Sequence, residues 1–242
     1  MKKADLPFKV TGKITTNPDG TIDVDGGVRY KKTATSLGVR FRKVNSSFNC
    51  GNTKITSLEG APQSVGGSFI CGNTKITSLE GAPQSVGGSF WCAFTKITSL
   101  EGAPQSVGGV FDCSYIPITS LKGAPPSVGG SFYCFDTKIT SLEGAPQSVG
   151  DSFWCTNNPS LSLVGVHKTL PKNFQCKHFF FSDSVKGGLG LKLVKGIREI
   201  VVYNEIVVYI NNQLTDLFNS TNDILELQEW LIDAGYPNLA RI

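Results

Sequence analysis

Cysteines recur at a fixed interval through the middle of this chain. The seven of them stand 21 residues apart, at positions 50, 71, 92, 113, 134, 155 and 176. The stretches between them are almost identical: TKITSLEGAPQSVGGSF fills 53–69 and 74–90, and it recurs with one change each at 95–111 and 137–153. Self-similarity at a fixed period of this length predicts a solenoid, in which each repeat forms one coil.

Bulk composition is that of an ordinary folded protein. Of the 242 residues, 40% are hydrophobic and 17% are charged, and the net charge is +4. This mild charge does not by itself indicate a nucleic-acid or membrane partner. The start has no apolar run of signal-peptide length, and nowhere do 18 consecutive apolar residues occur. We therefore expect a cytoplasmic protein with no membrane partner.

The cysteine spacing fits neither disulfides nor a metal site. Equivalent residues of neighbouring coils lie about 4.8 Å apart with parallel Cα–Cβ vectors, whereas a disulfide needs converging Cβ atoms about 3.8 Å apart. No CxxC or CxxH pair offers zinc spacing, and His167 and His178 are the only histidines. We expect a buried ladder of reduced cysteines, with no metal and no cofactor.

One coil is readable from residues 62–83. Phe69 and Cys71 alternate with Ile70, which predicts a short strand with Phe and Cys pointing inward. Gly66 and Gly67 supply a bend before the strand, and the Gly-Ala-Pro at 81–83 turns the chain on the opposite side. No stretch of the repeat is long enough for a regular helix. The prediction is a mainly β solenoid of 21-residue coils, with one parallel sheet and an irregular back.

The repeat resembles known ones. The order Pro-x-x-Val, Phe-x-Cys-x-x-Thr, Ile-x-x-Leu is similar to short bacterial leucine-rich repeats, and more closely to the repeat proteins of tailed-phage genomes. The resemblance extends from the lead-in at 17–29 to the ending at 189–242. It implies an architecture, a phage origin and a host-directed binding role, but no activity. The family has an inward Asn three residues after the cysteine, and here only Asn158 keeps it. The other residues at that position are Thr53, Thr74, Thr95, Ile116 and Thr137. Threonine hydroxyls are expected to satisfy the same backbone groups.

Both ends are expected to cap the stack. We assign 1–47 to an N-terminal β cap, 48–180 to the solenoid and 181–242 to an α+β C-terminal cap. In that cap, 189–210 reads as β, with a hairpin turning at Asn204-Glu205. A helix over NDILELQEWLIDA follows, N-capped by Ser220 or Thr221, ended by Gly235, and apolar on the face of Ile224, Leu227, Trp230 and Leu231.

The repeats differ mainly in three columns beside the strand, which we expect to face outward. The residue before each cysteine reads Asn49, Ile70, Trp91, Asp112, Tyr133, Trp154 and Gln175. The residue after it reads Gly51, Gly72, Ala93, Ser114, Phe135, Thr156 and Lys177. The next reads Asn52, Asn73, Phe94, Tyr115, Asp136, Asn157 and His178. Neutral drift would scatter differences evenly along the repeat, so their concentration indicates a contact surface.

The chemistry of these columns predicts a partner-binding face. Exposed aromatic patches mark interaction sites, and aromatic residues dominate protein interfaces. Our leading hypothesis is a protein partner, a host or antiviral-defence factor, with a structural or virion-associated interaction role as an alternative. The candidate binding residues are Trp91, Phe94, Asp112, Tyr115, Tyr133, Phe135, Asp136, Trp154, Gln175 and His178.

The main rival is a nucleotide or single-stranded nucleic acid stacked on the same rings, at about 1–3 kcal/mol per base. Its support is the lysine column at 54, 75, 96 and 138 and the basic lead-in of Arg29, Lys31, Lys32, Arg40, Arg42 and Lys43. A glutamate column at 59, 80, 101 and 143 has the same pitch and offsets the lysines, so we expect both columns to be solvated.

Catalysis is not expected. Asp112 and Asp136 would lie on an exposed sheet with no pocket to shift their pKa values. The cysteines face inward, where thiols are inert. GGLGLK at 187–192 lacks the GK[ST] ending of a phosphate-binding loop. We therefore predict a binding protein and not an enzyme.

Overall fold

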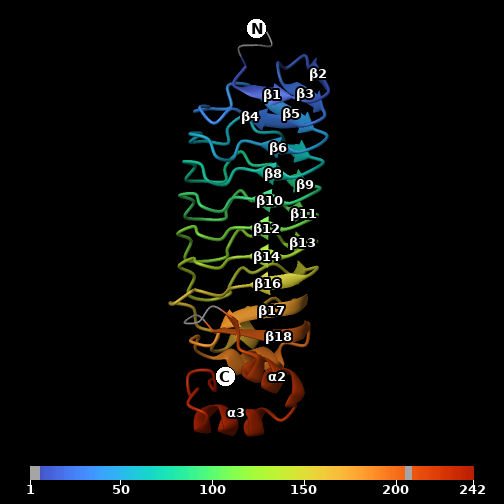
Figure 1. Ribbon diagram of the computed structural model, residues 1–242. Coiled ribbons are helices and arrows are strands. Elements are labelled where there is room, and N and C mark those ends of the chain that lie inside the picture. The colour runs from blue at the N-terminus through green and yellow to red at the C-terminus, as the bar shows by residue number, and fades with distance from the viewer. Residues whose placement is uncertain (1–5, 205–208) are drawn as a thin grey trace.

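The computed structural model describes residues 6–204 and 209–242 and confirms the β solenoid (Figure 1). Coils stack from the N-terminal end to the C-terminal end, and successive coils hydrogen-bond through parallel strands. Strands of equivalent coils align at the same repeat position, for example Phe69 beside Phe90 and Phe90 beside Phe111. The 21-residue period is therefore the length of one coil.

The first sheet is built from the strands before and around each cysteine. In the solenoid these strands are mostly two residues long, Phe followed by a variable residue, and they pair in parallel. Among the described residues the sheet has 11 strands, in this spatial order: β1 (Phe8–Val10), β4 (Val28–Tyr30), β6 (Phe48–Asn49), β8 (Phe69–Ile70), β10 (Phe90–Trp91), β12 (Phe111–Asp112), β14 (Phe132–Tyr133), β16 (Ser152–Trp154), β17 (Cys176–Ser182), β18 (Ile197–Asn204) and β19 (Tyr209–Ile210).

A second sheet lies where we expected an irregular back. The expectation of one sheet is wrong because the Ser-Val dipeptide of each repeat also pairs with its neighbours, with Val65 beside Val86. Glycine lets these coils approach: a Cβ on Gly87 would lie 2.3 Å from the carbonyl oxygen of Gly66. The strands, in spatial order, are β15 (Ser148–Val149), β13 (Ser127–Val128), β11 (Ser106–Val107), β9 (Ser85–Val86), β7 (Ser64–Val65), β5 (Phe41–Val44), β3 (Ile22–Asp25) and β2 (Lys13–Thr16).

Inward side chains form ladders along the stack. Phe69 and Phe90 are fully buried, and their rings stack with centroids 5.2 Å apart. The cysteines are buried and free, as predicted. The Sγ of Cys92 donates to the carbonyl oxygen of Asp112 in the next coil at 3.2 Å. Each coil can bury its apolar face only against its neighbours, so these ladders are the core.

The threonine prediction is confirmed. Thr53 Oγ1 donates to the carbonyl oxygen of Cys50 at 2.7 Å, and Thr74 does the same to Cys71 at 2.7 Å. At Asn158, the amide donates to the carbonyl oxygens of Cys134 and Cys155 at 3.0 and 2.9 Å. Threonine therefore replaces asparagine with a hydroxyl that satisfies one backbone carbonyl of its own coil.

The seventh coil breaks the register although Cys176 keeps the spacing. A short helix, α1 (Val166–Thr169), enlarges the preceding turn. As a result, Phe179 pairs with Phe153 and Phe180 pairs with Trp154. Gln175 bridges Ser148, a residue of the second sheet. Cys176 therefore does not occupy the position in its coil that the other six cysteines occupy in theirs, and the predicted alignment is wrong there.

Antiparallel strand pairs close the N-terminal end of the stack. β1 pairs with β4 and β2 pairs with β3, both antiparallel. From β4 and β3 onward, the solenoid continues in parallel through β6 and β5. Tyr30 is the last residue of β4 and stands where later coils have cysteine, and its hydroxyl donates to the carbonyl oxygen of Leu37 at 2.8 Å.

The C-terminal segment combines strands and helices. Residues 189–193, expected as β, instead belong to the 3₁₀ helix η1 (Gly188–Leu193). β18 and β19 pair antiparallel as expected for a hairpin, while the turn at 205–208 lies outside the described residues. The sequence analysis missed α2 (Asn212–Ser220), which packs against β18: Thr215 Oγ1 accepts from the backbone N–H of Val202 at 2.9 Å.

The last helix, α3 (Ile224–Asp233), starts later than expected. Asp223 is its N-cap and accepts from the N–H groups of Leu225 and Glu226, whereas Ser220 belongs to α2. Leu227 and Leu231 are buried, as predicted for the apolar face. Within the described ranges, none of the helices has both the length and the hydropathy needed to cross a membrane.

Candidate functional site

A single outward position can be followed across the first sheet from strand register. It runs through these residues in spatial order: Lys9, Arg29, Asn49, Ile70, Trp91, Asp112, Tyr133, Trp154 and Phe180. The predicted alignment from Asn49 to Trp154 is confirmed. Phe180 stands where Gln175 was expected, and two cations precede Asn49. This central column is basic at its N-terminal end and aromatic further along.

The predicted aromatic residues other than Trp91 form a connected set of rings, in which Tyr133 and Phe135 are joined at 6.0 Å. Phe94 and Tyr115 stack at 4.3 Å, and Tyr115 meets Phe135 edge-on at 5.3 Å. Trp154 meets Tyr133 edge-on at 6.1 Å and stacks on Phe180 at 3.7 Å. We call the following set the aromatic face: Trp91, Phe94, Tyr115, Tyr133, Phe135, Trp154 and Phe180.

Exposure is uneven over the aromatic face. Trp91, Phe94 and Tyr115 are 37%, 60% and 44% exposed, so they present most of the open apolar surface. Tyr133, Phe135 and Trp154 are half-buried, and Phe180 is buried beneath Trp154. An exposed apolar cluster on a folded surface indicates an interaction site. Its centre lies on the coils that contribute Trp91 to Tyr115.

Phe94 and Tyr115 occupy a backbone position that bulky residues rarely adopt. The third column has φ between +52° and +57° in six coils. Asparagine tolerates this left-handed region, and Asn73 donates from Nδ2 to Asn52 Oδ1 at 2.8 Å to form a ladder. An aromatic residue held there costs on the order of 1–3 kcal/mol, and such strain concentrates at functional sites. Two consecutive coils carry it with exposed rings.

Asp112 lies in an environment different from the one we predicted. We expected an exposed carboxylate, but the side chain is only 8% exposed, in register between Trp91 and Tyr133. Its Oδ1 accepts from the N–H of Ser114 at 2.9 Å. Burial raises the pKa of the Asp112 carboxyl above its ordinary value, an effect that exceeds the opposing hydrogen bonds. Asp136 is half-buried and accepts from Asn157 at 3.4 Å.

The second column is mostly not an outward surface. Ser114 and Thr156 are 0% and 4% exposed, and Ala93 is 8% exposed. Phe135 is half-exposed and joins the aromatic face. Lys177, in the shifted seventh coil, is exposed and its Nζ lies 3.4 Å from Asp151.

Gln175 and His178 do not belong to the columns in which we placed them. Gln175 lies beside Ser148 of the second sheet. His178 pairs with Ser152, whose hydroxyl is 3.3 Å from its Nδ1, and its Nε2 is 3.3 Å from Glu199. A sequence signal for this shift exists: Leu170-Pro171 follows Ala145-Pro146 by 25 residues rather than 21. In the structure the offset at the strand is 26 residues, so Phe180 pairs with Trp154, and the sequence analysis missed this residue.

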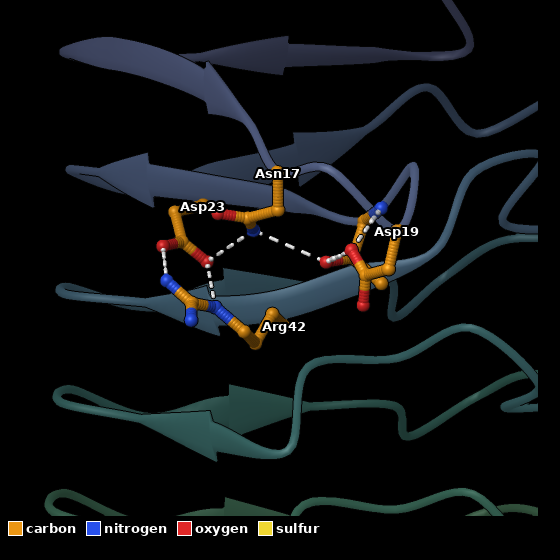
Figure 2. Close-up of polar contacts among 5 residues, drawn as sticks. Asn17, Asp19, Asp23 and Arg42 are labelled. Atoms are coloured by element: carbon orange, nitrogen blue, oxygen red, sulfur yellow. Dashed lines mark hydrogen bonds and ion pairs between the residues drawn. The ribbon is translucent and has the colours of Figure 1, made fainter.

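The basic lead-in divides between two surfaces. Arg42 lies on β5 of the second sheet and pairs with Asp23, as Figure 2 shows, so the pKa of Asp23 falls to about 2. Arg40 donates to the carbonyl oxygen of Asp19 at 3.0 Å. Lys43 also lies on β5. Arg29, Lys31 and Lys32 lie at the first sheet and, with Lys9, line a pocket that we call the basic pocket; its other lining residues are Tyr30, Asn49, Gly51 and Asn52.

The lysine and glutamate columns are solvated, as predicted. Lys54, Lys75, Glu59 and Glu80 are all exposed. In the fourth coil Lys122 replaces glutamate, and its Nζ lies 3.1 Å from Glu143, with both side chains more than 60% exposed. Exposed pairs of this kind contribute little to stability. These columns therefore offer no concentrated site.

A shallow hollow also follows the second sheet. It is lined by the Ser-Val-Gly stretch of successive coils, such as Ser85, Val86 and Gly87. At its C-terminal end it reaches Lys172, Lys177, Lys195 and Arg198. Its floor is the same in nearly every coil because those residues form the second sheet. We therefore assign this hollow to the architecture.

The seven cysteine thiols are poorly suited to act as nucleophiles. Burial raises the pKa of the Cys50 thiol to about 12, and the other cysteines shift in the same direction. Such thiols stay protonated and unreactive. Among the described residues, no group of three or more His, Cys, Asp or Glu side chains gathers as a metal site would require.

Comparison of the chain with known protein families, with curated proteins and with solved structures found no match.

Proposed function

We propose that this protein is a non-catalytic scaffold that binds a protein partner on the aromatic face. One observation carries the proposal: Phe94 and Tyr115 are exposed and stacked although their backbones lie in the left-handed region. Asparagine fits the same position in neighbouring coils without this strain. A strained, exposed aromatic pair lowers stability, so binding is the most direct reason for its presence.

Ring packing favours a protein over a nucleotide. Base stacking needs open ring faces, yet Phe94 covers Tyr115 and Trp154 covers Phe180 in nearly parallel stacks. Two carboxylates, Asp112 and Asp136, lie among the residues of the aromatic face and would repel phosphates. Aromatic surfaces broken by a few polar groups are typical of the centre of a protein interface.

The partner we propose is a host or antiviral-defence factor. Support comes from the resemblance of the repeat to proteins of tailed-phage genomes, which are made during infection of a host cell. A scaffold of this kind would act stoichiometrically, by covering a surface of its target. A structural role in a virion would use the same face and is the alternative that partner identification decides.

The test compares capture by the wild type with capture by a variant of the aromatic face. We choose Trp91→Asn, Phe94→Asn and Tyr115→Asn together, because asparagine occupies the same columns in other coils at Asn49, Asn52 and Asn73. The matched control carries Val164→Asn, Leu225→Asn and Ile232→Asn, three exposed apolar residues away from the face. Affinity capture from host lysate, with and without nuclease, identifies the partner. Binding is then measured with the purified partner.

The proposal requires that the wild type and the control bind the purified partner and that the aromatic-face variant loses at least about 2 kcal/mol of binding free energy, as expected for hot-spot residues. Equal affinity of all three proteins would exclude the aromatic face. Loss of capture after nuclease treatment would favour the nucleic-acid alternative.

A further inference from the structure

We infer that the basic pocket binds an acidic segment of the protein partner, next to the part of the partner that covers the aromatic face. The inference rests on the proposed function and adds the chemistry of the partner. Four cations line the pocket, on β1, on β4 and just after β4: Lys9, Arg29, Lys31 and Lys32. All four are exposed.

Strand register holds the cations together. Lys9 is the partner of Arg29 in the antiparallel pair of β1 and β4, and Arg29 is the partner of Asn49 in the parallel pair of β4 and β6. The backbone N–H of Lys31 donates to the carbonyl oxygen of Pro7 at 2.8 Å, which anchors the chain beside β1. Within residues 6–204 and 209–242 no acidic side chain forms an ion pair with any of the four cations. Their charge is therefore available to a ligand.

Two amides add neutral donors to the pocket. Asn49 Oδ1 accepts from the N–H of Gly51 at 3.1 Å, and Asn52 Oδ1 accepts from Asn73 at 2.8 Å. No described residue accepts from the NH₂ group of Asn49 or of Asn52, so both can donate to an anion. Gly51 has no side chain to fill the pocket. A Cβ at this position would lie 3.0 Å from Cγ2 of Ile70, so the site favours glycine. Cations with neutral donors around a hollow suit carboxylates.

The pocket is continuous with the aromatic face. From Arg29 the central column passes Asn49 and Ile70 to Trp91, which is three strand spacings, or about 14 Å. An extended segment covers that span in about four residues at roughly 3.3 Å each. The partner segment should therefore carry its acidic group about four residues from its apolar contacts. Asp112 and Asp136 would repel the acidic end, so the charges also fix the direction of the segment.

The cations favour an acidic polypeptide over a nucleic acid because they lie at one end only. A nucleic-acid strand on the aromatic face would place a phosphate beside every ring, next to Asp112 and Asp136. A polypeptide can confine its charge to one end. Charge complementarity of this kind sets orientation and association rate.

The pocket can be tested without the natural partner. Hexaglutamate is titrated into the ¹⁵N-labelled full chain, with hexalysine and the oligonucleotide (dT)₆ as comparison probes. We expect saturable shifts at the amides of Asn49, Gly51 and Asn52 that weaken with added salt. Arg29→Glu with Lys31→Glu should lower the hexaglutamate affinity by about tenfold or more. Arg29→Gln with Lys31→Gln supplies the same test at a milder charge change.

The control variant is Lys43→Glu with Lys172→Glu, which makes the same charge change on exposed residues that line the second-sheet hollow. It should bind hexaglutamate like the wild type. Equal loss in both variants, no saturable shifts, or stronger binding of (dT)₆ at the same amides would overturn the inference. The Trp91, Phe94 and Tyr115 variant keeps the pocket, so it should still bind hexaglutamate. Failure of the proposed function is thereby distinguished from failure of this inference.

Discussion

The rings of Phe94 and Tyr115 stack with centroids 4.3 Å apart and planes 13° apart, while their backbones have φ of 57° and 56°. The left-handed turn makes this contact possible because it repeats in adjacent coils and aligns the two side chains along the stack. In the first two coils the same geometry aligns Asn52 and Asn73 for a hydrogen bond. The turn thus supports either an amide ladder or a ring stack.

Phe94→Asn combined with Tyr115→Asn should stabilise the protein. Relief of two strained positions gains roughly 1 kcal/mol or more each, which exceeds the roughly 0.5–1.5 kcal/mol lost with the ring stack. We expect the free energy of unfolding to rise by about 1 kcal/mol, measured by urea denaturation. Lower stability of the variant would show that the aromatic residues support the fold rather than strain it.

Asp112→Asn should stabilise the protein near pH 7. The pKa of Asp112 is raised in the folded state, so its ionised form is penalised above that pKa and the penalty vanishes as pH falls below 3.8. The difference in Tm between variant and wild type should therefore be positive at pH 7 and shrink by pH 3.

Asp23 should show the opposite pH dependence. Its pKa is lowered to about 2, so the stability it contributes is present above pH 3.8 and is lost as pH falls toward 2. Asp23→Asn should accordingly lower the Tm at pH 7, and a gain there would contradict the assignment.

All seven cysteines should resist thiol reagents in the native protein. Each is buried, and burial raises the pKa of every one of these thiols, to about 12 for Cys50 and Cys176. At pH 8 we expect negligible reaction with a disulfide reagent in buffer and seven thiols per chain in denaturant. Fewer than seven under denaturing, non-reducing conditions would reveal a disulfide.

Neighbouring residues of β14 should differ sharply in their effect on stability. Phe132 is 0% exposed and stacks between Phe111 and Phe153, so Phe132→Ala should cost about 3–5 kcal/mol. Tyr133 faces outward and is half-buried, so Tyr133→Ala should cost about 1 kcal/mol. Urea denaturation of both variants measures the difference. Similar losses would mean that the outward rings belong to the core.

The repeat period and the inward ladders were readable from the sequence because both depend on local pattern. A fixed spacing of 21 residues sets the coil, and alternation around Cys71 and Cys92 sets which side chains face inward. The outward position of Trp91 and Trp154 follows from the same alternation, and the variable columns located the aromatic face.

Packing between coils decided the rest. The second sheet exists because glycine lets backbones such as those at Gly66 and Gly87 come close, and no local pattern states that distance. Burial of Asp112 and Ser114 depends on the coils above and below them. The helix α1 shifts the register of the seventh coil while Cys176 keeps its spacing, so sequence period and spatial alignment separate there. The basic lead-in likewise divides between the two sheets, because the chain passes from β4 of the first sheet to β5 of the second within this segment.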